Sequence, residues 1–162
     1  MKIGVISDTH LKGPDARLLA IIRKYFPDTD LILHAGDLVD LKVLSAFGEK
    51  EVVAVCGNMD PPRVEEEIPF KRVLEIGRFR IGLIHGWGSP HDLEDRIRGE
   101  FDRVDCIVYG HSHCPANHVR DGILFFNPGT ACERRHAVSN TVGILEVGET
   151  AIVGRVITID KD

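Results

Sequence analysis

Residues 105–113 read DCIVYGHSH, and this stretch joins an apolar run to a pair of histidines. The run from Cys106 to Tyr109 meets a glycine, and His111 and His113 follow one residue apart. A short apolar run bounded by glycine is typical of a buried β-strand. Two imidazoles at the end of a strand can bind one metal ion, bind two, or bind none, so the rest of the sequence has to decide.

The same pattern, an apolar run that ends in a polar residue with metal-binding capacity, occurs at four further places. These runs lead to Asp8 with His10, to Asp37, to Asn58 and to His85. In open α/β folds, ligands bind in the crevice beyond the carboxyl ends of the strands. We therefore expect seven side chains from five strand ends to converge on one small volume.

The order of the predicted elements indicates an α/β protein with more than one sheet. Apolar periodicity and turn signals predict strands at 2–7, 31–37, 52–58 and 105–111, helices at 13–26, 38–47 and 90–101, and hairpins within 70–86, 118–126 and 141–159. Strands and helices thus alternate in the first half of the chain, and hairpins dominate the second half. A simple doubly wound sheet would not give this order.

Length and composition limit the class of protein. A chain of 162 residues fits one domain, 1–162, with a sizeable core. The formal net charge of -5 argues against a strong nucleic-acid surface, and no apolar run approaches the length of a membrane span. The four cysteines form no CxxC pair, which favours a reducing, cytoplasmic setting.

The seven candidate ligands are two aspartates, one asparagine and four histidines. One ion of ordinary coordination number does not take seven protein ligands, whereas two ions that share a bridging aspartate would take four each. Two divalent ions and two carboxylates leave a formal charge of about +2, which suits an anion such as phosphate. Mixed imidazole and oxygen ligation suits Mn, Fe, Zn, Co or Ni.

Taken together, these motifs resemble the calcineurin-like metallophosphoesterase superfamily. The resemblance rests on Asp8-x-His10, Gly36-Asp37, Gly57-Asn58, His85-Gly86, Gly110-His111-Ser112-His113 and Asn127-Pro128-Gly129-Thr130, and it extends from Lys2 to about Val156. The short chain and the order of the motifs are similar to the small prokaryotic phosphodiesterase branch, to which the retromer scaffold subunit also belongs.

The resemblance implies a four-layer αββα sandwich, with two mixed sheets face to face and helices outside. It also implies two divalent transition-metal ions per chain, with Mn first among the candidates. Asp8, His10 and His113 would hold the first ion, Asn58, His85 and His111 the second, and Asp37 would bridge them. A hydroxide between the ions would attack phosphorus in line, which makes Asp37, Asn58 and His85 the predicted catalytic residues.

One position departs from the pattern of the wider superfamily. Met59 follows Asn58, where many members have a histidine that assists the leaving group. General acid assistance is typically worth ~10²–10⁴-fold in rate. We therefore expect a preference for esters with good leaving groups, or another proton donor, for which Asp60 is the nearest candidate.

Several residues around the motifs have two open interpretations. His34 is either a packed histidine or a support for the ligands, and Asn127 and Thr130 either orient the histidine loop or form the turn at Pro128-Gly129. Arg134 and Arg135 either contact a substrate phosphate together with Asn58 or lie in a solvated loop.

The leading functional hypothesis is a binuclear phosphodiesterase that acts on a small phosphorylated substrate. The alternatives are a protein-interaction scaffold of the same fold with weak or no catalysis, and a phosphomonoesterase. The resemblance further suggests a homo-oligomer.

Overall fold

The computed structural model describes residues 1–132 and 139–160, in which the strands form two five-stranded sheets. The first sheet has the order β10-β9-β1-β2-β3, built from Ile152–Thr158, Thr141–Val147, Lys2–Ile6, Leu31–His34 and Val52–Ala54. Its strands β1, β2 and β3 are parallel, while β9 runs antiparallel to both of its neighbours, β1 and β10. The sheet is therefore mixed, and its parallel strands end at one edge.

The second sheet is also mixed. Its order is β4-β5-β6-β8-β7, built from Lys71–Ile76, Phe79–Ile84, Cys106–Val108, Ile123–Asn127 and Ala116–Arg120. Strands β5, β6 and β8 are parallel, and the two outer strands are antiparallel to their neighbours. The tight turn at Gly77-Arg78 joins β4 to β5, and the turn at Asp121-Gly122 joins β7 to β8, as the sequence predicts.

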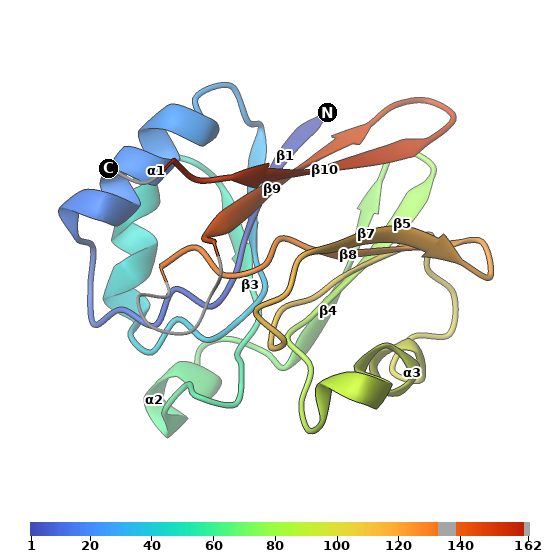
Figure 1. Ribbon diagram of the computed structural model, residues 1–162, viewed down its shortest axis with the longest axis horizontal. Helices are drawn as coiled ribbons and strands as arrows, with labels where there is room; N and C mark the ends of the chain where they lie inside the picture. The colour runs from blue at the N-terminus through green and yellow to red at the C-terminus, as the bar shows by residue number, and fades with distance from the viewer. Residues whose placement is uncertain (133–138, 161–162) are drawn as a thin grey trace.

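Helices cover the outer faces of the two sheets, and α1 and α3 lie on opposite sides of the sandwich (Figure 1). The helical segments are α1 (Ala16–Tyr25), the 3₁₀ turns η1 (Leu41–Phe47) and η2 (Pro90–Asp92), α2 (Pro62–Glu65) and α3 (Leu93–Arg98). Helix α1 begins at a side-chain cap, because the Asp15 carboxylate accepts the Leu18 N–H at 2.8 Å. The predicted four-layer αββα arrangement is confirmed.

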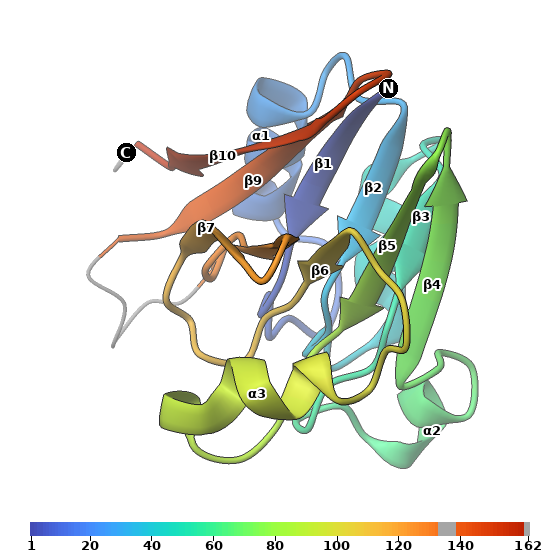
Figure 2. The same ribbon diagram turned by 90° about the vertical axis from the view of Figure 1, so that its right-hand side faces the viewer.

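The strands alternate their side chains between the two sides of each sheet. In β1, Ile3 and Val5 belong to the core between the sheets, whereas Ile6 packs with α1. The turned view in Figure 2 shows the two sheets beside one another, with the ends of β1, β2 and β5 on the side of α2 and α3.

A bulky residue of the second sheet fits against glycines of the first. The ring of Phe126, fully buried, lies so close to Gly143 and Gly154 that an added Cβ would come within 2.5 Å and 2.7 Å of it. Asn117 Nδ2 also donates to the Gly154 carbonyl at 2.7 Å, which ties β7 to β10. The two sheets therefore approach closely at this edge because glycine has no side chain.

Three helical details differ from the sequence prediction. The segment expected to be one helix over 90–101 is a 3₁₀ turn followed by α3, because Pro90 starts the first turn and Gly99 ends the second helix. The short helix expected over 38–47 is the 3₁₀ helix η1. Helix α2, four residues long, was not predicted.

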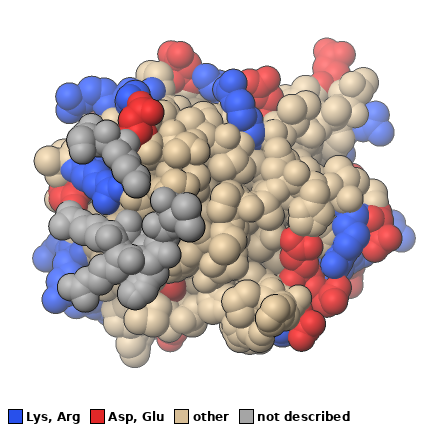
Figure 3. All heavy atoms as spheres, viewed as in Figure 1, with Lys and Arg blue, Asp and Glu red and all other residues tan. Residues whose placement is uncertain are grey.

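The charged side chains on the face seen in Figure 3 lie mainly at its periphery, with Lys and Arg interspersed among Asp and Glu. On this face, the residues drawn in colour form no continuous basic surface. Within residues 1–132 and 139–160, none of the helices has the length and apolar character needed to cross a bilayer.

Candidate metal centre

The predicted ligands lie where parallel strands of both sheets end. Asp8 follows β1 and Asp37 follows β2 in the first sheet, while His85 and His111 follow β5 and β6 in the second. Backbone hydrogen bonds continue beyond the strands, from Asp8 N to Gly36 O at 3.0 Å and from Gly110 N to His85 O at 3.1 Å. The strand ends thus hold the ligand-bearing loops in register.

The backbone at the predicted ligands is in an uncommon conformation. Asp8, His10, Asp37, His111 and His113 all have positive φ, between 49° and 67°. Such a conformation costs of order 1–3 kcal/mol for a residue with a side chain and persists only where the surroundings impose it. Five strained residues in one place therefore indicate a functional site.

The motif glycines leave room for the ligand side chains. An added Cβ at Gly57 would overlap the Asp37 carboxylate, and one at Gly110 would lie 2.8 Å from Asp8 Oδ2. Gly36 has φ of 93°, and an added Cβ there would lie 2.7 Å from His85. These glycines allow the backbones of different loops to approach the ligands closely.

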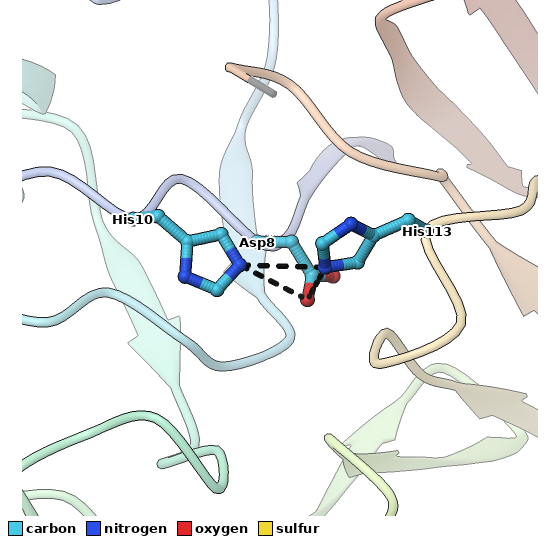
Figure 4. A group of neighbouring side chains, drawn as sticks. All are labelled: Asp8, His10 and His113. Carbon is cyan, nitrogen blue, oxygen red and sulfur yellow. Dashed lines mark hydrogen bonds and ion pairs between the residues drawn. The ribbon is translucent and has the colours of Figure 1, made fainter. Parts of the chain in front are cut away.

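Asp8, His10 and His113 form one group of ligand atoms (Figure 4). His113 Nε2 lies 3.1 Å from Asp8 Oδ1, and His10 Nε2 lies 3.8 Å from the same oxygen. The two imidazole nitrogens are 3.3 Å apart. Three ligand atoms of this kind, pointing at one position from two loops, have the spacing that a single transition-metal ion requires.

A second group, made of Asn58, His85 and His111, lies beside the first, with Asp37 next to it. His85 Nε2 is 3.3 Å from Asp37 Oδ2, and His111 Nδ1 is 2.9 Å from Asn58 Oδ1. The rings of His85 and His111 have centroids 5.4 Å apart. All seven predicted ligands therefore come together.

Asp37 lies between the two groups. Its Oδ2 is 3.7 Å from His10 Nε2 of the first group and 3.3 Å from His85 Nε2 of the second. Burial opposes ionisation of Asp37, but its contact with His85 and the N–H of Met59 outweigh it, so the pKa of the carboxyl is lowered.

Two buried atoms of the site indicate that a cation belongs there. Asp8 Oδ1 and His85 Nε2 are buried and make no hydrogen bond to the described residues. His85 Nδ1 is engaged with the Ala35 carbonyl at 2.7 Å, which directs Nε2 at the carboxylates. A buried acceptor without a donor costs free energy unless an ion or water satisfies it. The residues present therefore fit divalent metal.

The residues predicted to support the ligands contact the ligand loops. Asn127 Nδ2 donates to the Gly110 carbonyl at 2.9 Å and to Ser112 Oγ at 3.0 Å. Thr130 Oγ1 donates to the Asp8 carbonyl at 3.0 Å. His34 contacts a residue between two ligands: its Nε2 lies 3.1 Å from Thr9 Oγ1, and burial lowers its pKa to about 4.

Asp60 has a different place from the one the sequence suggested. Its carboxylate accepts the N–H groups of Asp37 (3.1 Å), Val39 (2.5 Å) and Gly57 (2.8 Å). Burial raises the pKa of Asp60, and the three N–H donors oppose that rise. Because both oxygens face backbone donors, the interpretation of Asp60 as a proton donor to substrate is wrong. Met59 beside it is 59% exposed.

Three contacts of the site were missed in the sequence. Ser7 Oγ donates to Asp8 Oδ2 at 2.5 Å, Thr9 contacts His34, and the Gly88 carbonyl lies 2.8 Å from His111 Nε2. Ser7 and Thr9 flank a predicted ligand, a signal that could have marked them, whereas a backbone carbonyl leaves no mark in a sequence. The predicted substrate contacts Arg134 and Arg135 lie outside the described residues.

Comparison with known proteins identifies the family. A family model described as "Calcineurin-like phosphoesterase superfamily domain" matches residues 1–150. This chain belongs to that superfamily. The resemblance drawn from the motifs is thereby confirmed, and the metallophosphoesterase assignment holds for nearly the whole chain.

Relatives of this metallophosphoesterase include small archaeal proteins. It is 40% identical over 135 residues to "Probable metallophosphoesterase MJ0623" of Methanocaldococcus jannaschii, covering 80% of this chain and 68% of the relative. It is 30% identical over 161 residues to phosphodiesterase MJ0936 of the same organism, covering 90% and 93%. Among solved structures, Vps29 of Chaetomium thermophilum matches with a TM-score of 0.81 at 21% identity, covering 99% and 90% of the two chains, which shows a shared fold.

Proposed function

We propose that this metallophosphoesterase is a phosphodiesterase with a binuclear metal centre. The observation that carries the proposal is the convergence of six further candidate ligands around Asp37, whose Oδ2 lies within 3.7 Å of a histidine from each group. Phosphodiesterase is also the printed name of the relative MJ0936.

The two groups of ligands divide between two ions. Asp8, His10 and His113 would hold the first ion, Asn58, His85 and His111 the second, and Asp37 both. Two divalent ions there would lower the pKa of a bound water and neutralise charge on the phosphoryl group. The nitrogen and oxygen donors suit Mn, and also Ni, Zn, Fe or Co.

The protein itself binds and orients the substrate. Two carboxylates against two divalent ions leave a formal charge of about +2, so the centre attracts a phosphate anion. Asn58 directs its Oδ1 toward His111, which leaves its amide N–H₂ to donate to a phosphoryl oxygen.

Neither Met59 nor its neighbour Asp60 is suited to protonate a leaving group. The Met59 thioether has no proton to give, and Asp60 accepts three N–H groups instead. We therefore propose that the preferred substrates are small diesters whose leaving groups need little protonation, such as aryl esters.

The test is a parallel assay of bis(4-nitrophenyl) phosphate and 4-nitrophenyl phosphate with Mn²⁺, with bound metal measured by mass spectrometry. We expect two metals per chain, faster turnover of the diester, and loss of turnover with a chelator or with Asp37→Ala. Asp102→Ala, which removes an exposed carboxylate, is the matched control and should retain activity. Two bound metals without turnover of either ester would exclude catalysis and leave the scaffold alternative.

Faster turnover of the monoester would instead establish the phosphomonoesterase alternative.

The four cysteines are free, which agrees with the proposed cytoplasmic location. Self-association stays a prediction, and sedimentation of the purified chain measures it.

A further inference from the structure

The loop that follows β5 contacts the predicted ligand His111. The Gly88 carbonyl lies 2.8 Å from His111 Nε2. A carbonyl oxygen only accepts, so this contact requires the hydrogen on Nε2. The other ring nitrogen, Nδ1, then presents its lone pair 2.9 Å from Asn58 Oδ1. Two acceptors this close favour a cation shared between them, which is the place of the second ion.

Arg96 of α3 holds the same loop from the opposite side. Its Nε donates to the Trp87 carbonyl at 3.0 Å, and its Nη2 donates to the Ser89 carbonyl. The helix itself is fixed because Leu93 and Ile97 are buried against the outer face of the second sheet. The guanidinium is therefore a fixed fork, and a planar fork can bind two carbonyls at once.

The two contacts of Arg96 lie on either side of the Gly88 carbonyl in the sequence. The Trp87 and Ser89 carbonyls point at the guanidinium, while the Gly88 carbonyl points at His111. Gly88 has φ of 77°, and a Cβ there would lie 3.4 Å from the Arg96 guanidinium. The Cβ would be in ordinary contact there, so it is the positive φ that favours glycine at position 88.

We propose that Arg96 is a positioning residue for the second metal site. It clamps the carbonyls of Trp87 and Ser89, so that the Gly88 carbonyl holds the hydrogen of His111 on Nε2 and leaves Nδ1 as the ligand. The expected effect on metal affinity rests on the proposed metal centre, whereas the tautomer of His111 is a property of the metal-free protein. Groups that orient ligands in this way typically contribute 10–100-fold to metal affinity.

The experiment measures the His111 tautomer by long-range ¹H–¹⁵N NMR in metal-free protein at about pH 8, where a free imidazole is neutral. The signals of His111 are assigned by their loss in His111→Ala. We expect the Nε2–H form in the wild type and a mixture of both tautomers in Arg96→Met. Arg96→Lys keeps the charge but donates from one point, and we expect an intermediate mixture.

Metal titration by calorimetry gives the second readout. We expect Arg96→Met to weaken binding of the second Mn²⁺ about 10–100-fold and to leave the first unchanged. Arg98→Met is the matched control, because Arg98 lies on the same helix but donates to the Phe101 carbonyl at 2.6 Å. If both Arg96 variants retain the Nε2–H tautomer and wild-type affinity for both ions, the proposal is refuted, whether or not the protein proves to be a phosphodiesterase.

Discussion

Replacement of Asp60 by asparagine tests whether one carboxylate fixes the strained loops of the metal centre. Its Oδ2 accepts N–H groups from Asp37 and Gly57, and its Oδ1 accepts the N–H of Val39. Asp37 and Val39 both have positive φ, 56° and 77°. The carboxylate therefore satisfies three donors of a backbone that would otherwise relax.

The expected loss of stability in Asp60→Asn follows from the hydrogen-bond acceptors that remain after the substitution. An asparagine in the same place keeps one oxygen, which can still accept from Asp37 and Gly57, but it turns an N–H₂ group toward Val39. One buried N–H then loses its acceptor, which costs about 1–3 kcal/mol. The charge of the carboxylate adds little, because burial, which raises the pKa of Asp60, offsets the gain from its donors. We expect Asp60→Asn to lower the free energy of unfolding by about 2 kcal/mol.

Urea unfolding of the metal-free protein measures this loss, and metal titration measures its effect on the centre. Because Asp37 lies between both groups, we expect Asp60→Asn to weaken both metal sites. Asp40→Asn is the matched control: Asp40 caps η1 and pairs with the exposed Arg63, so its replacement should leave the free energy of unfolding close to that of the wild type. Wild-type stability and wild-type metal affinity in Asp60→Asn would show that the three hydrogen bonds do not fix the loops.

Three further predictions concern the centre and its surroundings. His111→Ala should empty mainly the second site and His113→Ala mainly the first, measured as metals bound per chain; equal loss from both sites would contradict the division of ligands. Gly57→Ala should weaken both sites and destabilise the fold by about 1–3 kcal/mol, because its Cβ would overlap the Asp37 carboxylate. The pKa of His34 is about 4 in the folded protein and about 6.5 in the unfolded chain, so between these pH values the unfolded state binds a proton that the folded state does not. The free energy of unfolding should therefore fall by up to about 3 kcal/mol as the pH is lowered from about 6.5 to 4. Unfolding at several pH values should show a shallower fall in His34→Gln, and an unchanged slope would exclude His34 as the source.

Much of the fold was accessible from the sequence because its signals are local. The apolar run at 2–7 and the Gly77-Arg78 turn predict a strand and a hairpin, and the structure has β1 and the β4–β5 hairpin at these places. Helix α2 was missed because four residues, Pro62–Glu65, are too few for a helical period to be visible. The expected helix over 90–101 was too long because propensity does not show where a 3₁₀ turn gives way to an α-helix.

The candidate site was accessible for a different reason, namely that its side chains are of the few types that bind metal. Asp60 is of such a type too, and its position next to Met59 suggested a chemical task. Its real contacts are to backbone N–H groups of Asp37, Val39 and Gly57, and only the tertiary structure brings those donors to it. The Gly88 carbonyl is likewise a backbone group, so the residue type at position 88 does not indicate its contact with His111.

The fit of Phe126 against Gly143 and Gly154 has a consequence for the history of this chain. Three positions on three strands, β8, β9 and β10, share one volume, so a change at any of them alters what the other two can be. A methyl group gained at Gly143 would have to coincide with a smaller residue at position 126, and one gained at Gly154 would also require Asn117 to move. Sequence drift at this edge of the sandwich is therefore expected to be correlated, with the three positions inherited and replaced as a set.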